Sequence, residues 1–215
     1  MRIDVWSDVV CPWCYLGKKR LEEAVAGLDF ADELQIRWRA FQLDPTATAE
    51  PTDLEAAIDR KYGPGAFRSM SRRLGALGRE VGIDYRFDLA QRVTSLPALA
   101  LVAWVEASLG LDAADALHER LFRAYFSEGA SIADPANLVD WAVEVGADRE
   151  LAGEAVATGA GRDQVVADLR AAAEHQITGV PAFVIEDVHL IPGAQDVDTM
   201  RTLLARIHAR SYGAA

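Results

Sequence analysis

The pattern of hydrophobic and polar positions divides the chain into an α/β beginning, a helical middle and an α/β end. Near the N-terminus Ile3 and Val5 alternate with polar residues, which predicts a strand over residues 2–6 with one buried face. A helical pattern follows up to Gly27, and residues 34–41 alternate again as a second strand. A strand, a helix and a strand in this order form a βαβ unit, whose two strands normally run parallel in one sheet.

The middle of the chain, from Thr52 to about Ala173, has a helical pattern throughout. The apolar stretch over residues 96–109 has no polar face, so it is expected to be a helix buried in the middle of a helical layer. Thr52 and Glu55 have the spacing of a capping box. The expected helix N-caps are Thr52, Ser95, Asp112 and Asp134.

Two short β-prone runs, residues 182–185 and 188–191, are expected to form a hairpin around Glu186 and Asp187 before a last helix. The element order is therefore β-α-β, a helical block, and β-β-α. This order predicts an α/β fold, a thioredoxin-like sheet interrupted by a large all-helical insertion. The predicted boundaries are residues 1–45 and 176–215 for the discontinuous thioredoxin-like domain and residues 46–175 for the insertion.

The length, charge and apolar runs of the sequence limit the classes of partner and the cellular location that we expect. The chain has 215 residues, enough for a proper core, and its formal net charge of −11 argues against nucleic acid and anionic membranes as partners. The longest apolar run, residues 96–105, is too short to span a bilayer. The first residues read directly as a strand, without the pattern of a signal peptide, so we expect a cytoplasmic protein.

The candidate chemistry lies in Cys11-Pro12-Trp13-Cys14, at the junction of the first strand and the first helix. Pro12 suits the first helical position, which places Cys11 at the N-cap. Free N–H groups and the helix dipole stabilise an anion there, so the thiolate of Cys11 is favoured. Cys14 lies one turn further on the same side, close enough to bridge. We interpret the pair as a redox-active dithiol, which is the expected use of a lone C-x-x-C in a cytosolic chain.

A zinc site and an inert structural disulfide are the alternatives for this pair. Structural zinc needs four ligands, and the sequence has no further cysteine and no pair of histidines at ligand spacing, so no metal is expected. The histidines are His118, His175, His189 and His208. His118 stands beside Glu119 and Arg120, the pattern of a solvated helix face.

The second half of the site is predicted at Thr178-Gly179-Val180-Pro181, just before the third strand. A proline is tolerated at the first residue of a strand, and a tight turn is where a cis X-Pro bond is most often retained. A cis bond would turn the backbone of Val180 outward to pair with an extended substrate. These residues alone fit a trans bond equally well, but their occurrence together with the C-x-x-C motif favours a cis-proline loop beside the dithiol.

Five segments carry a resemblance to the DsbA-like family of the thioredoxin superfamily, and specifically to its cytosolic FrnE-like branch. They are residues 7–17 (SDVVCPWCYLG), 41–45 (FQLDP), 121–129 (LFRAYFSEG), 177–183 (ITGVPAF) and 193–195 (GAQ). The resemblance implies a thiol–disulfide oxidoreductase in which Cys11 is the exposed attacking thiolate, Cys14 the resolving thiol and Pro181 the cis-proline.

The same resemblance implies the substrate contacts and the partners. Pro12, Trp13 and Val180 would contact the substrate, and the partners would be disulfide-containing proteins or peptides, or low-molecular-weight thiols. The redox-active group would be the Cys11–Cys14 disulfide itself, with no other cofactor and with glutathione as a candidate reductant.

Two positions depart from related proteins. Many thioredoxin-like proteins hold a buried acid six residues before the first cysteine, where this chain has Val5. Relatives also carry an Ala-His-Arg-type sequence where this chain has residues 98–100, Ala-Leu-Ala. Because Val5 stands in place of the buried acid, proton transfer at Cys14 would need water or Asp8, and Asp8 is expected to be a solvated loop residue.

Two other functions remain open at this point. One is a glutathione-dependent isomerase or transferase of the kappa or 2-hydroxychromene-2-carboxylate isomerase type, whose members generally carry a serine or a single thiol at this position. The other is a non-enzymatic peptide-binding holdase, which would survive the loss of both thiols. The sequence leaves the net direction of exchange, the substrate and the oligomeric state open.

Overall fold

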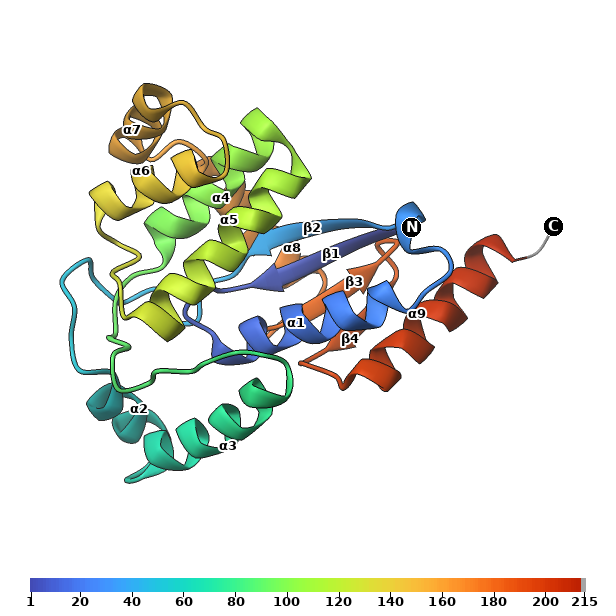
Figure 1. The fold of residues 1–215 in the computed structure, drawn as a ribbon, viewed down its shortest axis with the longest axis horizontal. Helices are drawn as coiled ribbons and strands as arrows, with labels where there is room; N and C mark the ends of the chain where they lie inside the picture. Colours follow the sequence, from blue (N-terminus) through green and yellow to red (C-terminus); the bar gives the residue numbers. More distant parts are fainter. Residues whose placement is uncertain (214–215) are drawn as a thin grey trace.

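The computed structural model describes residues 1–213 and contains a four-stranded sheet in the order β2-β1-β3-β4 (Figure 1). β1 (Arg2–Ser7) pairs in parallel with β2 (Gln35–Ala40). β3 (Ala182–Ile185) runs antiparallel to β1 and forms a hairpin with β4 (His189–Pro192). The predicted βαβ unit and the predicted hairpin are both confirmed.

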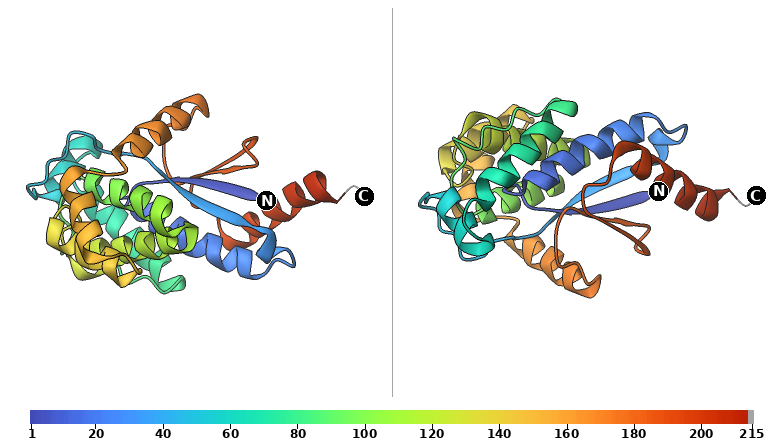
Figure 2. Two further views of the ribbon diagram at one scale, coloured as in Figure 1. Left: turned by 90° about the horizontal axis from the view of Figure 1, so that it is seen from above. Right: turned by 90° about the horizontal axis from the view of Figure 1, so that it is seen from below.

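β1 is a central strand that is covered on both faces, not on one as predicted. α1 (Pro12–Ala26) and α9 (Val197–Tyr212) cover one face, and α8 (Arg162–Glu174) covers the other (Figure 2). Ile3 and Val5 pack toward α1 and α9, whereas Trp6 packs toward α8. The alternation of apolar and polar residues did not reveal this, because Asp4, the polar residue between Ile3 and Val5, is buried in a charged network.

This network joins α8 to the sheet through Arg39, which bridges the buried carboxylates of Asp4 and Asp168 at 2.8 and 3.0 Å. Asp168 also accepts a hydrogen bond from the backbone N–H of Ala40, and its own carbonyl accepts one from the Trp6 indole. Buried charges are tolerated when they are paired and hydrogen-bonded in this way. The network therefore fixes the last helix of the insertion on β1 and β2.

The predicted helical block is present between β2 and β3, after a short 3₁₀ turn, η1 (Ala31–Glu33), that precedes β2. Its further elements are α2 (Leu54–Tyr62), α3 (Ala66–Glu80), α4 (Leu96–Leu109), α5 (Leu111–Arg123), the π-helical turn η2 (Ala124–Glu128), α6 (Pro135–Glu144) and α7 (Arg149–Thr158). α4 has the predicted bounds and lies within the helical layer, in contact with α5, α6, α7 and α8.

Two of the four predicted N-caps differ from the structure. α2 is capped by Asp53, which accepts a hydrogen bond from the Ala56 N–H, and not by Thr52. α5 begins at Leu111 after Gly110, so Asp112 lies inside its first turn. Each of these acidic residues, Asp53 and Asp112, occupies a position that suits the positive end of a helix.

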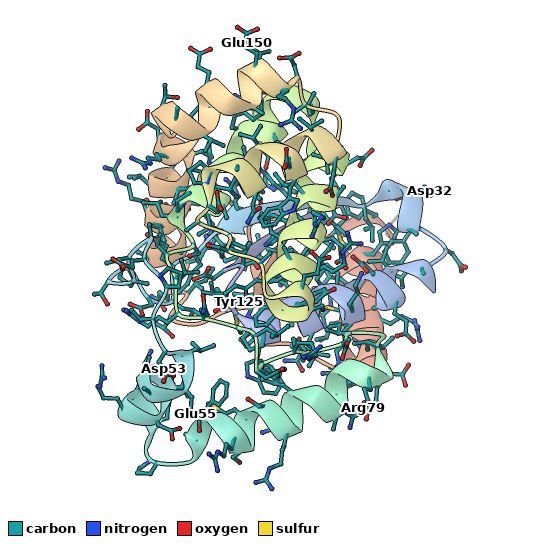
Figure 3. All side chains as sticks on the ribbon, turned by 60° about the vertical axis from the view of Figure 1, so that its left-hand side comes forward. Asp32, Asp53, Glu55, Arg79, Tyr125 and Glu150 are labelled. Atoms are coloured by element: carbon teal, nitrogen blue, oxygen red, sulfur yellow. The ribbon has the colours of Figure 1, made fainter. Side chains whose placement is uncertain are left out.

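Thr52 instead closes the base of a protruding segment, residues 52–92, which we call the α2–α3 segment. The backbones of Thr52 and Arg92 exchange two hydrogen bonds of 2.9 Å. The Tyr85 hydroxyl donates to the carbonyl of Pro12 at 2.5 Å, which fixes the segment over the start of α1. Figure 3 shows α2 and α3, with Asp53, Glu55 and Arg79, set apart from the helices around Tyr125.

Within residues 1–213, no helix combines the length and the apolar composition that crossing a bilayer requires.

Candidate functional site

The two cysteines lie where β1 passes into α1, at the junction of the sheet and the helical insertion. Cys11 is the N-cap of α1 and has extended backbone angles, and Pro12 is the first helical residue, as predicted. The Cys11 N–H donates to the Asp8 carbonyl at 2.9 Å, which closes the turn after the strand. The sulfur of Cys11 therefore sits at the positive end of a helix dipole, with Cys14 one turn behind it.

Cys11 was predicted to be exposed, and that prediction is wrong: the residue is 3% exposed, and Cys14 is fully buried. Both side chains belong to a hydrophobic cluster that they share with the helices of the insertion. The sequence could not show this burial, because the covering residues come from the distant α2–α3 segment and from the loop before β3. Cys11 lines a cleft between these parts.

The loop before β3 supplies one wall of the site. The Val180–Pro181 peptide is cis, and the Cys11 thiol donates a hydrogen bond to the Val180 carbonyl at 3.6 Å. Behind this contact the Pro181 ring packs on Gly17 of α1, where an added Cβ would lie 2.9 Å from the Pro181 Cγ. The structure thus brings this loop, predicted from sequence, into contact with the dithiol.

A cleft of about 590 Å³ opens above Cys11, with Pro12, Trp13 and Val180 on its wall. Its lining is mostly apolar and includes the aromatic or sulfur-containing side chains Phe41, Tyr62, Phe67, Met70, Phe87 and Phe126. Lys61 adds a cation, and the Arg73 guanidinium lies over the Trp13 ring at 5.2 Å. This size and lining suit a small ligand or a short peptide segment with apolar groups.

The surroundings of Cys14 hold it in the thiol form. Burial raises the pKa of Cys14 well above its usual value, and the hydrogen bond and charge of Cys11 raise it further. Hydrogen bonds from the Asp8 backbone and the Ser7 hydroxyl act in the opposite direction. Cys14 is therefore a protected thiol that must lose its proton before it can react.

Asp8 was predicted to be solvated, but it is completely buried beneath the loop that follows β2. Its two carboxylate oxygens accept hydrogen bonds from the backbone N–H groups of Val10 at 3.3 Å and Leu43 at 2.8 Å. Ser95 is the N-cap residue of α4, as predicted, but its side chain makes no capping hydrogen bond. Asp8 connects the dithiol turn to the distant loop after β2, and no local pattern predicts that.

The buried carboxyl of Asp8 should make stability depend on pH. Burial raises its pKa from 3.8 to about 6. Because the folded-state pKa is the higher one, the contribution of Asp8 to stability is fully present below about pH 4 and is lost as pH rises through about 6. The loss amounts to about 3 kcal/mol at neutral pH. Urea unfolding of the native chain and of Asp8→Asn, which cannot titrate, measures this difference between about pH 4 and 7.

His118 was also predicted to be solvated, but it is buried at 2% exposure between Trp38 and Phe122. Burial, with the charge of Lys18, lowers its pKa to about 3, so the ring is neutral at physiological pH. The helical spacing of apolar residues in the sequence did indicate that His118 is buried. Ala114 and Phe122 stand four residues on either side of His118, which places the histidine in the apolar stripe of α5.

The donor set offers little to a metal ion. In the part of the chain that the structure describes, no three His, Cys, Asp or Glu side chains come together as a candidate metal site. Zinc commonly binds C-x-x-C together with two further ligands of this kind. The chemistry of the site is therefore interpreted through the two thiols and their neighbours.

The chain is similar to several known proteins. The uncharacterized protein YwbO of Bacillus subtilis (strain 168) is 29% identical over 206 residues, covering 95% of this chain and 96% of YwbO. The probable DsbA oxidoreductase SCO1869 from Streptomyces coelicolor superimposes with a TM-score of 0.89 at 30% identity, covering 100% of this chain and 91% of that one. A 2-hydroxychromene-2-carboxylate isomerase shares the fold, with a TM-score of 0.74 at 18% identity and complete coverage of both chains.

The family described as the DSBA-like thioredoxin domain matches residues 2–205. This match includes the dithiol turn, the whole helical insertion, the loop before β3 and most of α9. The chain therefore belongs to the family of DSBA-like thioredoxin domains.

Proposed function

We propose that this protein is a thiol–disulfide oxidoreductase that uses Cys11 and Cys14 as its redox pair. The observation that carries the proposal is the position of Cys11. Its sulfur lies at the N-terminus of α1, beside the Val180 carbonyl, and on the wall of the cleft. A helix N-terminus favours the thiolate, which is the form that attacks disulfides.

The reaction proceeds in two exchange steps. The Cys11 thiolate attacks one sulfur of a substrate disulfide, and the other sulfur leaves as a thiolate. Cys14 then attacks the Cys11 sulfur of the mixed disulfide, forms the Cys11–Cys14 bond and releases the second substrate thiol. Two electrons pass from the dithiol to the substrate, and the reverse sequence oxidises a substrate dithiol.

The burial of Cys11 restricts which class of disulfide substrate can reach its sulfur. A disulfide inside a folded protein cannot approach a residue that is 3% exposed at the base of a cleft. The cleft volume of about 590 Å³ suits a low-molecular-weight disulfide or an extended peptide segment. We therefore propose substrates of this class, with glutathione as a partner thiol.

The test is the equilibrium of the dithiol with mixtures of reduced and oxidised glutathione. The free thiols are alkylated at each ratio, and the fraction of protein with a Cys11–Cys14 disulfide is then measured by mass spectrometry of the intact chain. The proposal expects one two-electron transition between dithiol and disulfide, with a glutathione adduct on Cys11 as the intermediate. If the pair stays reduced at every ratio of the two glutathione forms, the proposed function is wrong.

The aromatic lining of the cleft supports a second candidate, a glutathione-dependent isomerase acting on small aromatic substrates. In that case glutathione supplies the nucleophile, and turnover would survive when both cysteines are replaced by serine. A third candidate, the peptide-binding holdase, would also survive that change. Loss of activity in the double variant favours the oxidoreductase over both.

A further inference from the structure

The charge around the cleft above Cys11 is opposite in sign to the charge of the whole chain. The sequence has a formal net charge of −11, yet residues 52–92, the α2–α3 segment, contain eight basic and six acidic residues. Among the described residues that line the cleft none is acidic, and one, Lys61 of α2, is basic. A molecule in the cleft therefore meets a locally positive environment on an acidic protein.

Two cations of the α2–α3 segment lie at the cleft without a carboxylate partner. The Lys61 Nζ lies over the Tyr62 ring at 5.2 Å, and the Arg73 guanidinium lies over the Trp13 ring, also at 5.2 Å. Within residues 1–213 neither Lys61 nor Arg73 takes part in an ion pair. A cation whose contact is an aromatic face keeps its charge available for an anion that enters beside it.

The acidic residues closest to Lys61 on α2 are engaged by other partners. Asp59 accepts hydrogen bonds from the backbone N–H groups of Gly65 and Phe67, both at 2.9 Å. Glu55 pairs with Arg68 of α3 at 3.1 Å. These two carboxylates hold the turn between α2 and α3 together, so they leave the charge of Lys61 unpaired.

The same wall of the cleft exposes large apolar side chains. Tyr62 is 55% exposed and Met70 is 40% exposed, and both line the cleft. Large apolar side chains that stay exposed around a hollow are typical of a site that receives an apolar group. The facing wall, around Val180, is a loop that offers backbone groups instead. The two walls therefore suit different halves of a bound molecule.

We propose that the substrate is a low-molecular-weight disulfide in which one half combines an aromatic or similar apolar group with a carboxylate. The inference rests on the proposed function, because it takes Cys11 as the sulfur that attacks this disulfide. The apolar group packs on the wall that contains Tyr62 and Met70, and its carboxylate lies beside Lys61. The other half of the disulfide lies along the loop that contains Val180.

Lys61 and Tyr62 determine specificity and take no part in the bond changes. The Cys11 thiolate forms a bond to one substrate sulfur, and the other sulfur leaves with the electron pair of the broken S–S bond. Lys61 keeps its proton throughout and attracts the carboxylate of the substrate. Its effect is therefore on which disulfide reaches Cys11, and not on the reactivity of the sulfur.

The experiment compares three aromatic disulfides that share one ring and differ in charge. They are dithiobis(nitrobenzoate), which is anionic, and its amides with ethanolamine, which is neutral, and with ethylenediamine, which is cationic. The initial rate of thiol release from each probe in excess is divided by the rate of mercaptoethanol with the same probe, which removes differences in intrinsic reactivity. We expect the anionic probe to react about fivefold faster than the neutral one, and the cationic probe to react most slowly. The net charge of the chain alone predicts the reverse order.

Variants of α2 locate the charge that produces this order. Lys61→Gln should slow the anionic probe about threefold, and Lys61→Glu about tenfold, the scale expected of one partly exposed charge. Both should leave the neutral probe within about 1.5-fold of the native rate. Arg60→Gln is the matched control, because it removes the same charge from the adjacent residue, which does not line the cleft. Arg60→Gln should therefore change the rate with each probe by less than about 1.5-fold.

The apolar half of the proposal has its own variant. Tyr62→Ala should slow both the anionic and the neutral aromatic probe about threefold, because a contact with an aromatic ring is lost. It should leave the aliphatic anion dithiodipropionate within about 1.5-fold of its native rate. Tyr62 and Lys61 are both exposed, so these changes should not disturb the fold.

Three results would overturn the proposal. The first is a native protein that reacts no faster with the anionic probe than with the neutral one. The second is an equal loss in Lys61→Gln and Arg60→Gln, which would mean that Lys61 acts only through the overall charge. The third is a Tyr62→Ala variant that keeps the native rates with the aromatic probes.

This test and the glutathione equilibrium can fail independently. If the Cys11–Cys14 pair equilibrates with glutathione but the three probes follow the net charge of the chain, the proposed function stands and the substrate class is wrong. If the probes react in the expected order but the pair stays reduced at every glutathione ratio, the cleft selects anionic aromatic molecules and the proposed redox function is wrong.

Discussion

Cys11→Ser and Cys14→Ser are expected to stop disulfide exchange at two different points. Without the Cys11 sulfur no attack occurs, so exchange should fall by at least about a thousandfold, the scale on which loss of a nucleophile acts. Without Cys14 the first attack proceeds, but the mixed disulfide on Cys11 is not resolved. Mass spectrometry of each variant after incubation with oxidised glutathione should show no adduct on Cys11→Ser and one adduct on Cys14→Ser.

The contrast between the two variants is the decisive part of this prediction. Cys14 is fully buried behind Cys11, so it should not form an adduct when Cys11 is absent. An adduct of equal yield on both variants would show that either thiol can attack, which contradicts the assignment of Cys11 as the nucleophile. The double serine variant serves as the control for non-covalent retention of glutathione.

Asp168→Ala is expected to lower the free energy of unfolding by about 3 kcal/mol, the range found when one partner of a buried ion pair is removed. The change leaves Arg39 with Asp4 as its remaining carboxylate partner and takes the acceptor from the Ala40 N–H. Since Asp168 anchors α8 on the sheet, the effect should appear as a lower urea midpoint for cooperative unfolding.

Asp140→Ala provides the matched control for Asp168→Ala. Asp140 forms an ion pair of similar length with Arg149, but both side chains are more than half exposed. Exposed pairs of this kind contribute little, so a change of about 0.5 kcal/mol or less is expected. Similar losses in the two variants would mean that the buried network contributes no more than a surface ion pair.

The parts of the site that the sequence predicted correctly depend on local chemistry. Pro12 can begin a helix and cannot continue one, so Cys11 as the N-cap follows from the residues themselves. The proline of the loop ending in Val180 and Pro181 restricts the backbone in a similar way, and the C-x-x-C motif elsewhere in the chain favoured the cis bond that the loop adopts. The hairpin around Glu186 and Asp187 was predicted from the two β-prone runs that flank it.

The parts that were predicted wrongly depend on distant segments. β1 appeared half-buried because the helix that covers its other face, α8, begins more than 150 residues later. Asp8 and His118 are polar residues that tertiary contacts bury, and Cys11 is covered by the α2–α3 segment. In each case the missing information was what packs against the residue, which the local pattern does not contain.

Because Thr52 and Arg92 pair at the base of the α2–α3 segment, substrate specificity can evolve independently of the redox chemistry. The α2–α3 segment leaves the fold and returns to it at this one pair, so its length and sequence can change at little cost in loop entropy. It supplies much of the cleft wall, but it contains neither cysteine and does not include the loop before β3. Descendants of this chain could therefore exchange the segment and admit different molecules while inheriting the same dithiol.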